Sequence, residues 1–210
     1  MIKILIVDDH SVVREGLKQI ISGNTNMAVE GEARNGDEAL NKIKQHSYSI
    51  VILDIAMPGK NSLDTMKEIR LAQPHLPVLI LSMYPEDQYA VRFFRAGASG
   101  YLTKKSAPEE LVNAIRTVAK GKKYVSPSLA EALVIDLDTR AGRPLHEALS
   151  DREFQVLRMM ASGRTTGDIA EELFLSGKTV STYRSRILEK LRLKNTAELI
   201  NYAIQNRLVD

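Results

Sequence analysis

The chain has 210 residues, enough for one large domain or two small ones. With 44% hydrophobic residues, 26% charged residues, a formal net charge of +3 and no Cys, it has a globular composition that excludes a disulfide scaffold and thiolate metal sites. No apolar run approaches the ~18 residues of a membrane span, and the first residues lack signal-peptide features, so we expect a cytoplasmic protein without membrane contact.

Short apolar segments alternate with amphipathic segments over residues 1–122. The apolar segments are rich in Ile, Val and Leu, which is typical of strands buried on both faces of a parallel sheet. The predicted strands are residues 2–7, 27–33, 50–53, 78–81 and 101–102. The predicted helices are residues 12–21, 37–45, 63–71, 87–96 and 108–119. This alternation predicts an α/β doubly wound domain with a five-stranded parallel sheet and a functional crevice at the carboxyl ends of its strands.

Polar residues follow four of the predicted strands. Asp8 and Asp9 follow the first strand, Asp54 the third, Ser82 the fourth and Lys104 the fifth. Carboxylates that converge at one edge repel each other unless a cation lies among them, and hard oxygen ligands with open positions favour Mg²⁺. A nearby ammonium and hydroxyl can bind a phosphoryl group. The set predicts a carboxylate that accepts phosphate, although each Asp alone is more often a helix cap.

The remaining residues divide into a connector and a helical region. We expect a linker over residues 123–145, with a short apolar helix from Ser126 to about residue 135 and an exposed stretch over residues 138–144. Residues 146–210 show no strand pattern and contain four helical segments.

Those four segments have the pattern of a helix-turn-helix domain. Ser150 and Thr165 each begin a capping box, Ser176 is the predicted N-cap of a longer helix, and residues 196–206 form the last helix. Residues 178–194 contain a cluster of basic residues and one acidic residue, Glu189. Such a cluster is typical of a nucleic-acid-binding face or of a solvated helix face. The basic residues are Lys178, Arg184, Arg186, Lys190, Arg192 and Lys194.

Several motifs extend this interpretation. ILIVDDH (residues 4–10), ILDIAMPG (52–59) and GASGYLTK (97–104) resemble the two-component receiver domain. LSDRE (149–153), IAEELFLSGKTV (169–180) and RILEKL (186–191) resemble the LuxR-type tetrahelical helix-turn-helix domain. Together they cover nearly the whole chain, which resembles the NarL/FixJ family of response regulators.

The resemblance implies roles for individual residues in the first domain. Asp54 would be the phosphorylated residue, and Asp8 and Asp9 would hold Mg²⁺ together with Asp54 and the carbonyl group of Ala56. Lys104 would pair with the phosphoryl group. Ser82 would move toward that group, and Tyr101 would turn inward behind Ser82.

The resemblance also implies contacts with DNA. Ser181, Thr182 and Ser185 would face base edges, with Arg184 or Arg186 reaching toward them. The predicted phosphate contacts are Lys178, Thr179, Tyr183 and Lys190. A histidine kinase or a small acyl-phosphate donor would phosphorylate the protein, which would then form a homodimer and bind operator DNA as a transcription regulator rather than an enzyme.

Two other classes of protein remain as alternatives. A haloacid-dehalogenase-type phosphatase would use Asp8 as its nucleophile, but that family needs an Asp two residues later, where this chain has His10. A receiver with a protein-binding adaptor would need no basic cluster in its last helices. Phosphatase turnover and an electrophoretic shift with genomic DNA distinguish these alternatives from the regulator.

Overall fold

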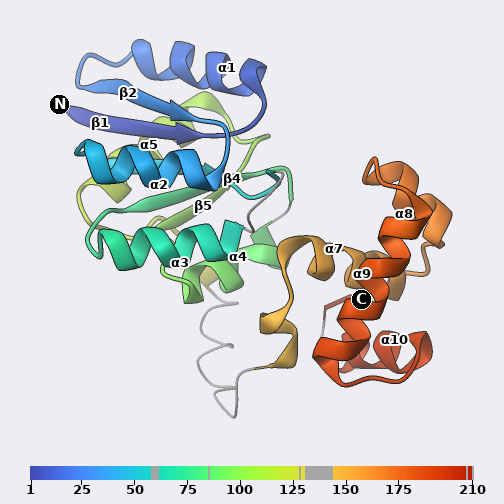
Figure 1. The fold of residues 1–210 in the computed structure, drawn as a ribbon. Coiled ribbons are helices and arrows are strands. Elements are labelled where there is room, and N and C mark those ends of the chain that lie inside the picture. Colours follow the sequence, from blue (N-terminus) through green and yellow to red (C-terminus); the bar gives the residue numbers. More distant parts are fainter. Residues whose placement is uncertain (58–61, 85, 128, 131–143, 207, 210) are drawn as a thin grey trace. The chain divides into compact units, whose positions relative to one another are not determined.

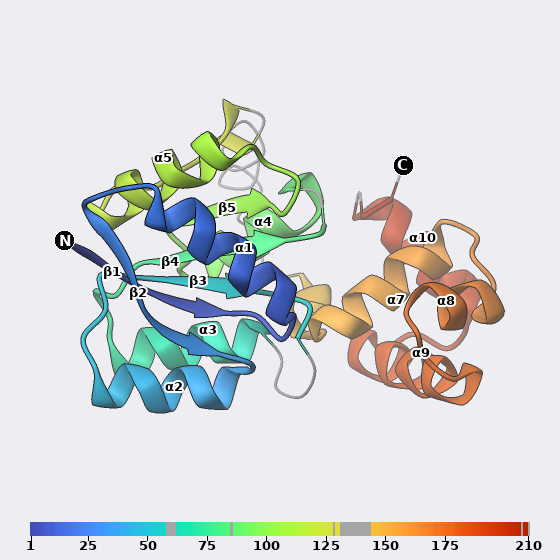
Figure 2. The same ribbon diagram turned by 90° about the horizontal axis from the view of Figure 1, so that it is seen from above.

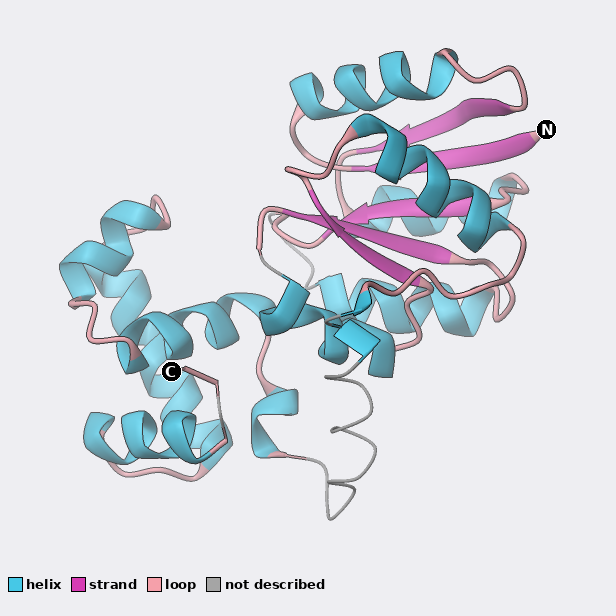
Figure 3. Cartoon of the chain, turned by 180° about the vertical axis from the view of Figure 1, so that it is seen from behind, coloured by secondary structure: helices cyan, strands magenta, loops and turns pink. Residues whose placement is uncertain are grey.

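A computed structural model describes residues 1–57, 62–84, 86–127, 129–130, 144–206 and 208–209. The chain divides into two compact units, residues 1–140 and 141–210. Figure 3 shows strands only in the first unit, and the described residues of the second unit are helical or in loops. None of the described helices has both the length and the apolar composition needed to cross a membrane.

The first unit is built around a five-stranded sheet with the order β2-β1-β3-β4-β5 and parallel pairing throughout (Figure 1). Its central strands are buried at nearly every position, as their continuous Ile, Val and Leu content predicts. The strands are β1 (Ile2–Val7), β2 (Met27–Ala33), β3 (Ile50–Asp54), β4 (Val78–Ser82) and β5 (Gly100–Thr103).

Five helices cover the two faces of this sheet. Figure 2 shows α1 and α5 on one face, with α2 and α3 on the other. On the first face, Leu17 of α1 and Ile115 of α5 pack against sheet residues such as Ile6 and Ile52. The helices are α1 (Ser11–Ser22), α2 (Gly36–Gln45), α3 (Ser62–Ala72), α4 (Glu86–Arg95) and α5 (Pro108–Ala119).

The strand register sets which side chains meet at the edge of the sheet. Val7 of β1 pairs with Leu53 of β3, so the residues that follow them, Asp8 and Asp54, emerge at the same level. Ser82 of β4 pairs with Thr103 of β5, immediately before Lys104. The predicted α/β fold is therefore confirmed, and the parallel register explains why the predicted polar residues gather at one edge.

The first part of the predicted linker packs on the first unit. Tyr124 forms a parallel bridge with Gly100 beside β5, and the Lys123 ammonium donates to the carbonyl of Ala98 at 2.5 Å. The chain is helical at Pro127, as expected for the predicted short helix. Residues 131–135 of the predicted helix and residues 138–143 of the predicted exposed stretch lie outside the described residues.

The second unit contains the predicted four helices and one short element before them. A 3-10 helix, η1 (Leu145–Ala148), precedes the first of these and did not appear in the sequence pattern. Ser150 and Thr165 form capping boxes with Glu153 and Asp168, as predicted, and the Ser176 side chain caps α9. The helices are α7 (Asp151–Ala161), α8 (Thr166–Glu172), α9 (Gly177–Leu191) and α10 (Thr196–Gln205).

We predict that Gly36→Ala destabilises the first unit by about 1–3 kcal/mol, because the added Cβ would overlap the buried Thr65 side chain where α2 meets α3. Gly16→Ala is the matched control in α1, since no atom apart from its chain neighbours and the backbone of its own helix lies within 4 Å of the added Cβ. That change should instead raise stability by about 0.5–1 kcal/mol. Urea unfolding measures the stability of both variants. Equal changes in the free energy of unfolding for Gly36→Ala and Gly16→Ala would contradict the prediction.

Candidate functional site

The centre of the site is an ion pair cluster at the carboxyl edge of the sheet. The Lys104 ammonium lies 2.6 Å from Asp8 Oδ2 and 2.9 Å from Asp54 Oδ2. The side chains of Asp8 and Asp54 are 2% and 1% exposed, and that of Lys104 is 9% exposed. The structure thus brings together three of the predicted residues in a largely dehydrated pocket.

Burial and charge act in opposite directions on these groups. Burial raises the pKa of Asp54, and the Asp8 carboxylate adds to that effect, while the Lys104 ammonium partly offsets it. Burial alone would lower the pKa of Lys104, but the carboxylates of Asp54 and Asp8 outweigh burial and raise it. Lys104 is therefore held as a cation that compensates the charge of the two aspartates.

Asp9 and His10 complete the acidic cluster. Ligand atoms from Asp8, Asp9, His10 and Asp54 all lie within 4.8 Å of one another. His10 Nδ1 is 2.9 Å from Asp9 Oδ1 and 3.2 Å from Asp8 Oδ1, and the His10 amide donates to Asp8 Oδ1 at 2.8 Å. The cluster can hold a divalent cation through its carboxylates, as the sequence predicts.

Arg14 supports this acidic loop and was missed by the sequence reasoning. Its guanidinium donates from Nη1 to the carbonyl of Asp8 at 2.8 Å and from Nε to Glu32 Oε2 at 2.9 Å. Arg14 shares the buried face of α1 with Leu17 and Ile21. A charged residue at a core-facing position of an amphipathic helix was the signal that could have found it.

The predicted switch residues are joined through the backbone of Tyr84. Its amide donates to Ser82 Oγ at 3.0 Å, and its carbonyl accepts from the hydroxyl of Tyr101 at 2.9 Å. Ser82 and Tyr101 are both buried, so Tyr101 lies in the inward orientation in this structure. The amide of Lys104 donates to the carbonyl of Ser82 at 2.7 Å, which connects the switch to the acidic pocket.

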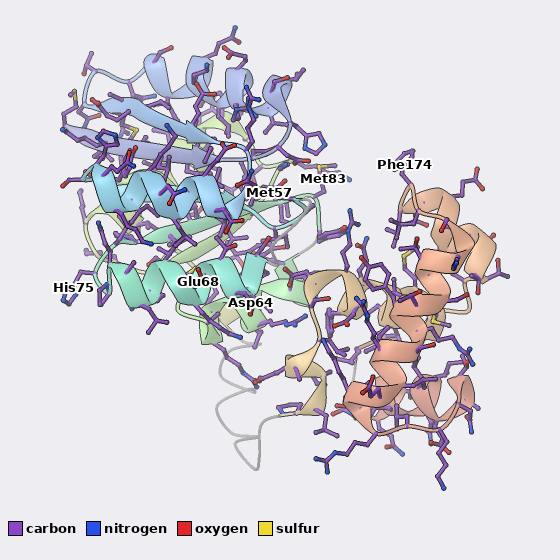
Figure 4. All side chains as sticks on the ribbon, in the orientation of Figure 1. Met57, Asp64, Glu68, His75, Met83 and Phe174 are labelled. Atoms are coloured by element: carbon purple, nitrogen blue, oxygen red, sulfur yellow. The ribbon has the colours of Figure 1, made fainter. Side chains whose placement is uncertain are left out.

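Two methionines flank the pocket. Met57 follows β3 and Met83 follows β4, and both lie at the same edge of the sheet in Figure 4. Met57 is buried, whereas Met83 is 56% exposed. The Ala56 amide donates to Asp54 Oδ1 at 3.2 Å, while a role for the Ala56 carbonyl as a metal ligand stays a prediction. Pro58 and Gly59 of the third-strand motif lie outside the described residues.

The second candidate site is the outer face of α9. Val180, Ile187 and Leu191 are buried on the inner face, and Ser181, Thr182 and Ser185 are exposed on the opposite face. A shallow hollow on this surface has only polar and basic side chains in its lining. They belong to Ser176, Lys178, Thr179, Thr182, Tyr183 and Arg186.

Two of the predicted DNA contacts are engaged within their own unit. The Lys190 ammonium lies 2.6 Å from Glu153 Oε2, whose side chain is 4% exposed. Arg184 donates from Nε to the Thr196 hydroxyl at 2.8 Å. Contacts of these two residues with DNA stay predictions, but each would have to release or share an internal partner to make them.

Two families match this chain. Residues 4–116 match the response regulator receiver domain, and residues 147–203 match the luxR family of bacterial regulatory proteins. The chain is 37% identical over 215 residues to the oxygen regulatory protein NreC of Staphylococcus carnosus, covering 99% of each chain.

Solved structures of the response regulator RcsB are also similar. One is RcsB from Salmonella enterica serovar Typhimurium bound to promoter P1flhDC with the phosphomimetic BeF3⁻, at 27% identity and a TM-score of 0.59, covering 96% of this chain and 97% of that one. Another shows two RcsB dimers bound to two parallel DNAs, at 27% identity and a TM-score of 0.58, covering 96% of each chain.

We predict that Lys190→Met destabilises the second unit by about 1–3 kcal/mol at neutral pH, because it leaves the buried Glu153 carboxylate without its ammonium partner. Lys178→Met, on the exposed face of the same helix, is the matched control and should change stability little. Thermal unfolding of the two variants measures the difference. If both variants were as stable as the unchanged protein, the Lys190–Glu153 pair would make no net contribution to the free energy of unfolding.

The same pair makes the second unit sensitive to acid. Although burial opposes it, the Lys190 ammonium and the Ser150 amide lower the pKa of Glu153. The fold therefore favours the ionised carboxylate, and this stability is present above the usual pKa of Glu and is lost as the pH falls through the lowered value. Lys190→Met should thus raise the pH at which acid unfolds the second unit, and an unchanged midpoint would contradict this.

Proposed function

Because the chain belongs to the NarL/FixJ family of two-component response regulators, which control transcription through a LuxR-type DNA-binding domain, we propose that its switch is phosphorylation of Asp54. The observation that carries this proposal is the position of the Asp54 carboxylate. It lies at the end of β3, 2.9 Å from the Lys104 ammonium and beside Asp8.

The chemistry follows from the groups around that carboxylate. An oxygen of Asp54 attacks the phosphorus of the donor, and an O–P bond forms as the bond to the kinase imidazole nitrogen or to the acyl oxygen of a small donor breaks. The leaving group takes the electron pair of that bond. Lys104, held cationic by its aspartates, is placed to stabilise the added negative charge on the phosphoryl oxygens.

The acidic residues fit a magnesium ion. Asp8 Oδ2 and Asp9 Oδ1 are buried, with the Lys104 ammonium beside the first and His10 Nδ1 beside the second. Hard carboxylate oxygens are what Mg²⁺ prefers, so both atoms suit the ion as ligands. Asp8, Asp9, Asp54 and the carbonyl of Ala56 would hold the ion. When bound, Mg²⁺ supplies positive charge that offsets the carboxylates and the incoming phosphoryl oxygens.

The switch then acts as a shift between two populations. Ser82 Oγ accepts from the Tyr84 amide, and a movement of Oγ toward the phosphoryl group, to which its hydroxyl would donate, would draw it away from that amide. The carbonyl of Tyr84 also accepts a hydrogen bond from the hydroxyl of Tyr101. A movement of the Tyr84 backbone therefore alters the surroundings of the Tyr84 and Tyr101 rings. Phosphorylation thereby favours one arrangement of the surface around α4 and β5.

The output is dimerisation and binding to operator DNA in the cytoplasm. This part of the proposal is supported by the family assignment, by the basic hollow along α9 and by the RcsB dimers on DNA. Lys178, Thr179, Tyr183 and Arg186 line the hollow beside the hydroxyl face of α9 and would contact phosphates there. The family favours a regulator over the phosphatase alternative.

We predict that Asp54→Asn abolishes phosphorylation by acetyl phosphate and removes the gain in DNA affinity that phosphorylation produces. Asp64→Asn on α3 is the control, since Asp64 is an exposed carboxylate whose ion-pair partner is Lys67 (Figure 4). A hydroxylamine-sensitive phosphate assay and a DNA titration with and without donor measure both effects. A hydroxylamine-labile phosphate on Asp54→Asn at the unchanged level would refute the assignment.

Changing Asp8 and Asp9 together to Asn should lower Mg²⁺ affinity by about tenfold or more, because two ligand charges leave the site. The fold should survive, since Asn is nearly isosteric and fewer carboxylates repel each other. Isothermal titration with Mg²⁺ gives the affinity and circular dichroism gives the fold. An unchanged affinity in the folded double variant would show that the cation binds elsewhere.

A further inference from the structure

The exposed hydroxyls of α9 share one arrangement that neither the family assignment nor the fold requires. Ser181 donates to the carbonyl of Gly177 at 3.0 Å, Thr182 to that of Lys178 at 3.0 Å, and Ser185 to that of Ser181 at 3.1 Å. Each bond runs back along the helix to the residue four positions earlier. The only proton of each hydroxyl is therefore used inside the helix.

A hydroxyl has one proton to donate and two lone pairs that accept. With the proton directed at the helix backbone, Ser181, Thr182 and Ser185 present only acceptors to whatever approaches their exposed face. To donate outward, a hydroxyl would have to rotate and give up its internal bond. The exposed face of α9 therefore presents hydrogen-bond acceptors at these three hydroxyls.

We propose that this face selects exocyclic amino groups in the DNA major groove, the N6 amino group of adenine and the N4 amino group of cytosine. Those are the hydrogen-bond donors in that groove, whereas N7 of purines, O6 of guanine and O4 of thymine are acceptors. The inference rests on the proposed DNA binding through α9. It adds the chemical class of base group that α9 recognises.

The basic residues near this face also leave the contacts with bases to the hydroxyls. Arg184, whose guanidinium could donate to guanine, is hydrogen-bonded to Thr196, and Lys190 is paired with Glu153. Lys178 and Arg186 line the hollow and supply donors to its surface. In this arrangement the hydroxyls accept from bases, and these two cations bind phosphates.

The test uses the full-length phosphorylated protein and a duplex selected from a random pool. In that duplex each adenine is replaced in turn by purine, which lacks the N6 amino group, and each cytosine by 2-pyrimidinone, which lacks the N4 amino group. A parallel set carries 7-deazapurines, which lack the N7 acceptor. We expect removal of an amino group to weaken binding by about fivefold at one or more positions, as for loss of one hydrogen bond, and the 7-deaza set to have little effect.

Protein variants link the effect to the hydroxyls. Thr182→Val is nearly isosteric and Ser185→Ala removes only an oxygen, so in each variant the sensitivity to one amino group should disappear. Asn201→Ala, exposed on α10, is the control that should keep the full pattern. Circular dichroism confirms that each variant folds.

Three other results would contradict the inference or the proposed DNA binding on which it rests. If 7-deaza substitutions weaken binding and Thr182→Val removes that sensitivity, the hydroxyl donates to N7 and the inference is wrong. If tight binding is insensitive to both sets, α9 recognises backbone or shape and the inference is also wrong. A protein that prefers no selected duplex over random DNA would instead overturn the proposed DNA binding on which the inference rests.

Discussion

The charge balance of the acidic pocket depends on the Lys104 ammonium, which lies between the carboxylates of Asp8 and Asp54. Parallel strands carry these carboxylates to the same edge of the sheet, where burial would make their mutual repulsion costly without a counter-charge. The ammonium lies 2.6 and 2.9 Å from them and remains a cation because they raise its pKa. The pocket proposed to accept the phosphoryl group therefore already contains a positive charge next to Asp54.

Hydrogen bonds connect this cation to the predicted switch over a short path. The backbone of Lys104 is bonded to Ser82, the Ser82 hydroxyl accepts from the amide of Tyr84, and the carbonyl of Tyr84 accepts from Tyr101. Ser82 is the last residue of β4 and Tyr101 lies within β5, whereas Tyr84 and Lys104 lie in the loops that follow these strands. The path therefore joins two residues of the sheet through the loops at its carboxyl edge.

The second unit uses internal pairing to orient its exposed face. Capping boxes begin α7 and α8, and the Glu153 carboxylate of the first box also binds Lys190 of α9. Arg184 binds Thr196 at the start of α10. These pairs give two cations partners within the unit, while the hydroxyls of α9 are exposed and Lys178 and Arg186 line the hollow. Stability and recognition are therefore coupled through the same helix.

The sequence by itself determined the α/β and helix-turn-helix architecture, the gathering of Asp8, Asp54 and Lys104, and the caps at Ser150 and Thr165. Those features follow from periodicity and from the rule that parallel strands end at one edge, which are local or topological properties. Only the tertiary structure decided that Arg14 holds the Asp8 carbonyl and that Lys190 binds Glu153. It also decided that the α9 hydroxyls donate inward, because such partners depend on side-chain rotamers and on contacts between residues distant in the chain, which no spacing in the sequence encodes.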